Sequence, residues 1–259
     1  MKVHILGCGG SGGVPLVGGV WGRCDPGDPR NRRRRPSILV EHEGRHLLVD
    51  TSPDLRDQLL ETGTRDLDAV LFTHSHADHC HGIDDVRPLV YARGEPIPAY
   101  TDAHTLSALR QRFAYAFDAG ETTGALYSPL MVGHPMPIGE PMTIAGLTCV
   151  AFEQGHGPTT TLGFRIGPLG YSPDAHTIDE TGFAALDGID VWIVDCLSER
   201  PHPSHAHLER TLAWIDRVRP RRAIFTHMNH TMDYATIAAR CPAGVEPGVD
   251  GMSVDVDGA

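Results

Sequence analysis

Short apolar runs that end in polar residues recur along the chain. They are three to six residues long, and their β-branched content favours strands with buried faces. The runs cover residues 3–6, 38–40, 47–49, 69–72, 147–152, 191–194 and 223–225.

Apolar residues at helical spacing occur between these runs. Leu208, Leu212 and Ile215 fall at i, i+4 and i+7, which predicts an amphipathic helix over residues 206–218 that ends before Pro220. A second helix is predicted after Thr101-Asp102, on the apolar positions Leu106, Leu109, Phe113 and Phe117. Strands that alternate with helices, without a Ser/Gly-rich linker, predict layered α/β architecture in one domain over residues 1–259.

Two of the predicted strands end in the same way. Residues 70–74 read Val-Leu-Phe-Thr-His, and residues 223–227 read Ala-Ile-Phe-Thr-His. Two sheets built from similar halves would bring these two histidines to one edge, although so short an echo also arises by chance.

Composition excludes several classes of protein. With 41% hydrophobic and 21% charged residues, the chain can bury a full core and is not disordered. A formal charge of −11 disfavours binding to nucleic acid or to an anionic membrane. No stretch approaches the ~20 apolar residues of a membrane span. The six cysteines are scattered without a Cys-x-x-Cys pair, so we expect reduced thiols and a cytoplasmic protein.

Directly after the strand predicted at residues 69–72, the chain reads Thr-His-Ser-His-Ala-Asp-His. Four of these side chains can bind a metal: His74, His76, Asp78 and His79. A loop that leaves a strand can turn the first two towards one ion and the last two towards a neighbour. Imidazole and carboxylate suit Zn, Mn or Fe, with coordination positions left open. The alternative, a solvated His-rich turn, is disfavoured by the regular spacing.

This cluster resembles the signature of the metallo-β-lactamase superfamily of metallohydrolases. The resemblance implies an α/β fold, an αββα sandwich of two mixed β-sheets flanked by helices, with the metals at one edge of the facing sheets. It also implies three more ligands: His156, the bridging Asp174 and His227. Read alone, His156 is a turn residue and Asp174 a helix N-cap. Asp50 is a candidate acceptor that orients the metal loop, or an ordinary turn residue.

Two divalent ions, Zn or Mn, would then lie about 3.5 to 4 Å apart and lower the pKa of bound water towards 7. Asp174 at the bridge points to phosphoester chemistry. By resemblance, antibiotic-hydrolysing members of the superfamily carry Cys at this position, which counts against that activity here.

Within the superfamily, the layout looks most similar to the phosphodiesterases of the carbon–phosphorus lyase pathway, which act on cyclic phosphates of ribose. The shared segments are residues 6–15, 172–174, 195–196, 226–230 and 248–252. By this resemblance, His205 aids phosphate binding and protonation of the leaving oxygen, with His202 and His207 as rivals and a plain polar loop as the alternative. The candidate catalytic residues are Asp78 and His205, and the outer or substrate candidates are Asp50, Ser172, His230 and Asp250.

The chain departs from that subgroup in one place. Its members carry a structural zinc on three Cys and a His, whereas here only Cys24 follows Trp21-Gly22. We expect a hydrogen-bonded loop, with a reduced metal site of Cys24, Asp25 and His230 as the alternative. Residues 30–35 hold five arginines, which form either an anion-attracting patch or a solvated loop.

The sequence thus predicts a dinuclear phosphodiesterase acting on a small phosphorylated substrate such as phosphoribosyl 1,2-cyclic phosphate or a nucleotide-like ester. The resemblance suggests a homodimer. Three rivals stay open: a tRNA 3′-end endonuclease, for which no long basic insertion is present; a glyoxalase-type thioester hydrolase; and a non-enzymatic metal or nucleotide sensor, which would not require the complete ligand set with His205.

Overall fold

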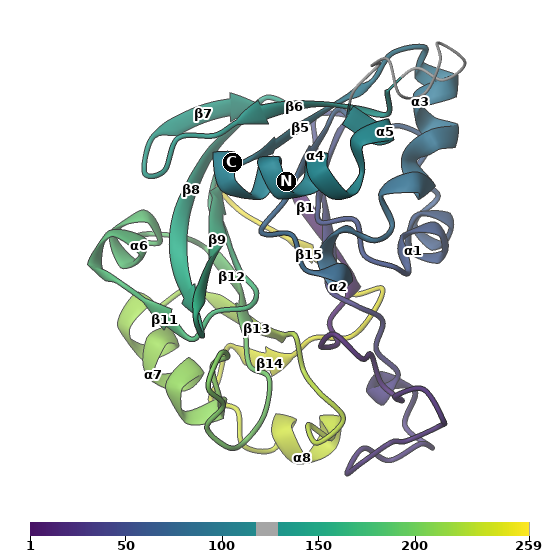
Figure 1. Ribbon diagram of the computed structural model, residues 1–259. Helices are drawn as coiled ribbons and strands as arrows, with labels where there is room; N and C mark the ends of the chain where they lie inside the picture. The colour runs from purple at the N-terminus through teal and green to yellow at the C-terminus, as the bar shows by residue number, and fades with distance from the viewer. Residues whose placement is uncertain (118–128, 259) are drawn as a thin grey trace.

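The computed structural model describes residues 1–117 and 129–258, and two β-sheets lie face to face in it (Figure 1). The strands of the first sheet are β1 (Lys2–Gly7), β2 (Ser37–His42), β3 (Arg45–Val49), β4 (Ala69–Leu71), β5 (Ile97–Thr101), β6 (Met131–Pro135) and β15 (Ser253–Asp255). Their order is β15-β1-β2-β3-β4-β5-β6. Pairing is antiparallel from β15 to β3 and parallel from β3 to β6, so this sheet is mixed.

The second sheet is mixed as well. Its strands are β7 (Pro141–Ile144), β8 (Leu147–His156), β9 (Thr159–Ile166), β10 (Leu169–Ser172), β11 (Thr177–Ile178), β12 (Val191–Asp195), β13 (Arg222–Thr226) and β14 (Val245–Pro247). Their order is β11-β8-β9-β10-β12-β13-β14, with β7 beside β8. The strands β10, β12, β13 and β14 run parallel, so their carboxyl ends meet at one edge.

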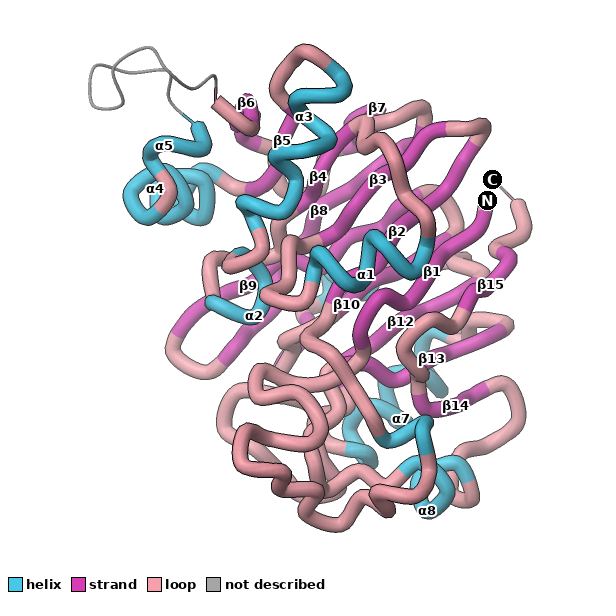
Figure 2. Tube along the Cα trace, turned by 90° about the vertical axis from the view of Figure 1, so that its right-hand side faces the viewer, coloured by secondary structure: helices cyan, strands magenta, loops and turns pink. Residues whose placement is uncertain are grey.

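Helices cover the outer faces of both sheets. Those of the first half are α1 (Leu55–Thr62), α2 (Ala77–Cys80), α3 (Arg87–Arg93), α4 (Ala103–Arg112) and α5 (Ala114–Phe117), with 3-10 turns η1 (Pro29–Asn31) and η2 (Ile83–Val86). Those of the second half are α6 (Glu180–Ala185), α7 (Leu208–Val218) and α8 (Tyr234–Ala238). Figure 2 shows α1 and α3 in front of the first sheet, while α7 and α8 lie beside the second. In the described part of the chain, no helix is both long enough and apolar enough to cross a membrane.

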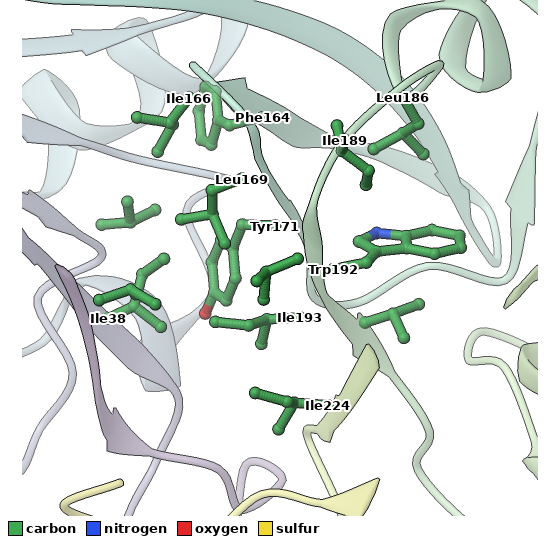
Figure 3. Close-up of a cluster of buried hydrophobic side chains, with 14 of the residues drawn as sticks. Ile38, Phe164, Ile166, Leu169, Tyr171, Leu186, Ile189, Trp192, Ile193 and Ile224 are labelled. Carbon is green, nitrogen blue, oxygen red and sulfur yellow. The ribbon is translucent and has the colours of Figure 1, made fainter. Parts of the chain in front are cut away.

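Successive apolar residues in the strands of the first sheet face opposite sides, so this sheet contributes to two separate hydrophobic cores. In β2, Ile38 and Val40 face the core between the sheets, whereas Leu39 belongs to a second core under the helices. The second sheet is also buried on both faces. In Figure 3, Tyr171 points towards Ile38 and Trp192 lies on the opposite face of its sheet, near Leu186 and Ile189. The predicted αββα sandwich is confirmed.

The predicted elements differ from the structure mainly at their ends. The helix expected over residues 206–218 is α7, which begins at Leu208 because His207 has an extended backbone, with φ −114° and ψ 165°. The helix expected after Asp102 is interrupted, because Phe113 leaves the helical region at φ −123° and ψ 44°. It therefore forms the two helices α4 and α5.

Candidate metal centre and active site

The predicted metal ligands meet where strands of both sheets end. Three residues there have a left-handed backbone although they are not glycine: Asp50 after β3 (φ 65°), Asp174 after β10 (φ 52°) and His227 after β13 (φ 58°). Such a conformation costs of order 1 kcal/mol or more and is concentrated at functional sites. Each bend ends a buried strand abruptly at this edge.

One group of possible ligands consists of three histidines from both halves of the chain. His74 and His76 come from the loop after β4, and His156 ends β8. Thr73 Oγ1 lies 3.0 Å from Nδ1 of His74, and the carbonyl oxygen of Ser204 accepts from Nδ1 of His156 at 2.8 Å. The Nε2 atoms of these two rings are therefore available to a cation.

A second group lies beside it and consists of Asp78, His79, Asp174 and His227. Nε2 of His79 is 2.9 Å from Oδ2 of Asp174, and Nε2 of His227 is 3.2 Å from the same oxygen. The other oxygen of Asp174 lies 3.8 Å from Nε2 of His156, which belongs to the first group. The carboxylate of Asp174 thus faces both groups.

Asp50 holds the loop that carries these ligands. Its Oδ2 accepts from Nδ1 of His79 at 2.7 Å and from Thr73 Oγ1 at 2.9 Å, and its Oδ1 accepts from the Thr73 backbone N–H at 2.8 Å. All these groups are buried. Hydrogen bonds of this kind fix the tautomer of a ligating imidazole.

Burial and neighbouring charges set the protonation of the two groups. Burial lowers the pKa of His74 well below its usual value and that of His156 to about 4. Burial acts in the same direction on His79, but the surrounding carboxylates, with Asp174 and Asp78 foremost, raise its pKa well above the usual value. His74 and His156 are therefore neutral, whereas the carboxylates around His79 attract positive charge.

The residues fit divalent ions. The buried atoms His74 Nε2, His79 Nε2 and Asp174 Oδ2 make no hydrogen bond within the described residues. His79 Nε2 and Asp174 Oδ2 are close without hydrogen-bond geometry, which is the arrangement of two ligands that share a cation. The donor set of imidazole and carboxylate suits Zn or Mn.

His205 lies against the same centre. Its Nδ1 donates to Asp195 Oδ2 at 2.9 Å and lies 3.8 Å from Asp174 Oδ1. Its ring is 4.6 Å from that of His156 and 4.8 Å from that of His227, measured between centroids. Burial lowers the pKa of His205. Of the three rival histidines, this is the one that reaches both ligand groups.

Three of the residues proposed to support the ligands or to bind substrate lie away from both ligand groups. Ser172 is fully buried and accepts from Nε1 of Trp192 at 3.0 Å, because alternation in β10 turns it away from the ligands. Asp250 accepts from Cys8 N at 3.0 Å and from the Arg34 backbone, so it joins distant segments of the chain. His230 accepts a backbone bond from Arg23 and belongs to no ligand group of the described residues. A substrate role for these three is not supported by their positions.

The arginines of residues 30–35 do not form a free cationic patch, although Arg30 and Arg32 are exposed to solvent. Arg33 is 2% exposed, and its guanidinium donates to Asn31 Oδ1 and the Asn229 carbonyl at 3.4 Å and to Cys24 Sγ at 3.8 Å. Carboxylates neutralise three others through the pairs Arg30–Asp28, Arg34–Glu61, Arg34–Asp250 and Arg35–Asp54. Arg32 lies over the Trp21 ring. Cys24 thus belongs to a hydrogen-bonded loop, as expected, and to no ligand group of the described residues.

Sequence reasoning missed three residues that orient the site. Asp195 ends the apolar strand β12 and could have been proposed on the same grounds as Asp50. Thr73 occurs in the Thr-His pair that is repeated at Thr226-His227. Ser204 acts through its backbone carbonyl, for which a sequence carries no signal.

Comparisons with known proteins agree with this geometry. A family model described as beta-lactamase superfamily domain matches residues 45–228. A solved structure of a diphosphatase from the PhnP family is 32% identical with a TM-score of 0.87, and the match covers 98% of this chain and 96% of that one.

Two curated relatives match this chain over only about half of their own length. An octanoyltransferase of Porphyromonas gingivalis is 30% identical over 260 residues, which cover 99% of this chain and 52% of the relative. A ribonuclease Z of Methanopyrus kandleri is 30% identical over 142 residues, which cover 53% of this chain and 46% of the relative. The chain spans about half the length of these curated relatives.

Proposed function

Because the chain belongs to the metallo-β-lactamase superfamily of hydrolases, we propose that it is a phosphodiesterase that requires two divalent ions, Zn or Mn. Its proposed substrate is a small cyclic phosphate, such as phosphoribosyl 1,2-cyclic phosphate, or a nucleotide-like ester. The observation that carries the proposal is the carboxylate of Asp174, whose two oxygens face different ligand groups. A bridging carboxylate suits a pair of ions, and paired ions suit displacement at phosphorus.

Two ions bound to these groups would supply an activated water and neutralise charge on the phosphoryl group. The chain itself orients the reacting groups and moves a proton. Asp195 accepts from Nδ1 of His205, which leaves Nε2 without a partner among the described residues. When protonated, that Nε2 can donate to the leaving oxygen, as a general acid does.

A small substrate is favoured over RNA. The similarity to ribonuclease Z covers about half of the chain, and a large nucleic acid needs unpaired cations for its phosphates. Most of residues 30–35 are neutralised or buried, and the net charge is −11. All six cysteines are free, which supports a cytoplasmic location. The homodimer stays a prediction.

The test is hydrolysis of bis(p-nitrophenyl) phosphate by Zn-loaded and Mn-loaded protein. Turnover should depend on metal, collapse in Asp174→Ala and persist in Asp216→Ala, a control on the exposed face of α7. Absence of turnover with two equivalents of metal bound would overturn the proposal. Thioesters would then be tested next, and a protein inactive on both would be treated as a sensor.

A further inference from the structure

The loop between β12 and α7 carries a second histidine at the site. The loop is closed at its base, where Leu197 N donates to the Ala206 carbonyl at 3.0 Å. His202 lies between two prolines in it, and their rings restrict the backbone on both sides. The partly exposed His202 therefore sits on a restrained segment.

Ser204 links His202 to a predicted metal ligand. Its carbonyl oxygen accepts from Nδ1 of His156 at 2.8 Å. Its backbone N–H lies 3.4 Å from Nδ1 of His202, and its Oγ lies 3.3 Å from the same nitrogen. One residue thus orients two imidazoles, one in the ligand group and one outside it.

These contacts select the tautomer of His202. A backbone N–H can only donate, so Nδ1 of His202 must be the acceptor. In the neutral ring the proton then resides on Nε2, which has no partner among the described residues. His205 has the opposite arrangement, because its Nδ1 donates to Asp195 and its neutral Nε2 is an acceptor.

His202 lies next to the groups that would hold the phosphate. Its ring centroid is 5.2 Å from that of His205, which in turn lies between His156 and His227. Burial lowers the pKa of His202, and the neighbouring histidines lower it further, His205 foremost and His227 among them. A neutral ring with an unpartnered N–H is the expected state at this position.

We propose that His202 is a substrate-binding residue whose Nε2–H donates to a non-bridging oxygen of the substrate's phosphoryl group. The assignment rests on the proposed phosphodiesterase function. The two neighbouring imidazoles then have different roles. His205 exchanges a proton with the leaving group, whereas His202 donates a hydrogen bond and keeps its protonation state. The donor is set by Ser204, so it is present before substrate binds.

Replacing His202 with Gln or Asn distinguishes the loss of the Nε2–H donor from the loss of side-chain packing. The amide nitrogen of Gln can occupy the place of Nε2, whereas that of Asn reaches only the place of Nδ1. His202→Asn and His202→Ala should lower kcat/KM for bis(p-nitrophenyl) phosphate roughly ten- to hundredfold, the effect of one hydrogen bond to a charged group. His202→Gln should retain activity within about threefold of wild type. His207→Asn is the matched control and should keep wild-type activity, because His207 occupies the N-cap position of α7 on the same loop and its side chain makes no hydrogen bond to the helix end.

Inorganic phosphate provides a readout that does not require turnover. Its dissociation constant for the metal-loaded protein should rise roughly tenfold or more in His202→Asn and His202→Ala and stay near the wild-type value in His202→Gln. Metal content should be equal in all variants. If wild-type protein binds phosphate but hydrolyses no diester, the proposed function fails while the His202 assignment is still decided by these constants.

Two kinds of measurement could overturn the assignment. The first is phosphate affinity: the assignment fails if His202→Gln loses as much affinity as His202→Ala, and it fails if His202→Ala loses none. The second is nitrogen NMR of histidine-labelled, metal-loaded protein in which the proton of His202 resides on Nδ1.

Discussion

Replacing Asp50 with Asn should weaken the binding of one metal ion without unfolding the protein. In the wild type, Oδ1 of Asp50 accepts from the Thr73 backbone N–H at 2.8 Å, and Oδ2 accepts from Nδ1 of His79 at 2.7 Å. The Asn amide must keep its oxygen towards the Thr73 N–H, because that group can only donate. Its NH2 group then faces His79 and moves the imidazole proton to Nε2, the nitrogen that would bind the ion.

The size of the effect follows from the lost hydrogen bond. A bond to a charged group contributes about 1.5–3 kcal/mol, so affinity at the group around His79 should fall roughly ten- to hundredfold, as is usual for such outer partners. Competition with a chromophoric chelator measures this for Zn and Mn. Asp68→Asn is the matched control, because Asp68 accepts from His46 N at 2.8 Å at the opposite end of β3. Two metal equivalents bound by Asp50→Asn as tightly as by wild type would refute the tautomer argument.

Three further outcomes are expected. Asp195→Asn should lower kcat for diesters with an alkyl leaving group about ten- to hundredfold, whereas kcat for p-nitrophenyl esters should change little. The reason is that only the poorer, alkyl leaving group needs a proton from His205. Equal losses of kcat on both esters would contradict this role. Metal binding near neutral pH should release a proton, and metal affinity should rise with pH. Burial lowers the pKa of His79, but the neighbouring carboxylates raise it by more, so the metal-free ring holds a proton that the ion displaces. Calorimetry in buffers of different ionisation enthalpy measures this proton release. A binding enthalpy that is the same in every buffer would count against it. Arg33→Ala should lower the free energy of unfolding in urea by about 3 kcal/mol without changing metal content, because it empties the space of a large side chain that is 2% exposed and removes its hydrogen bonds to Asn31 and Asn229. A loss below about 1 kcal/mol would show that the guanidinium is dispensable.

The metal cluster was predictable because its spacing is local. Four candidate ligands lie within six residues, directly after an apolar strand, so no long-range information was needed to group them. Asp174 and His227 were harder to predict, since each is an isolated residue at a strand end. They could be named because the resemblance required a ligand at each position. The structure supplies the physical reason, since the carboxyl ends of neighbouring parallel strands meet at one edge.

Other features depended on contacts between distant residues. Ser172 belongs to the same Ser-Pro-Asp segment as Asp174, yet it faces Trp192, because which side of a strand a residue occupies depends on the register of the whole sheet. Arg33 looked like one of several surface arginines. Its burial depends on the Asn229 carbonyl, which lies 196 residues away in the chain.

The three left-handed residues explain how a rigid core can place a reactive centre. The strands that precede Asp50, Asp174 and His227 are buried, so their ends are fixed by packing rather than by the loop. Asp tolerates the left-handed region better than most side chains do, and His to a lesser degree. Each bend costs of order 1–3 kcal/mol, which the buried strands offset. The ligand positions are thus held by the sandwich before any ion binds. Burial of the Asp78 carboxylate and, to a lesser degree, its repulsion from Asp174 are unfavourable, and a divalent cation would offset both.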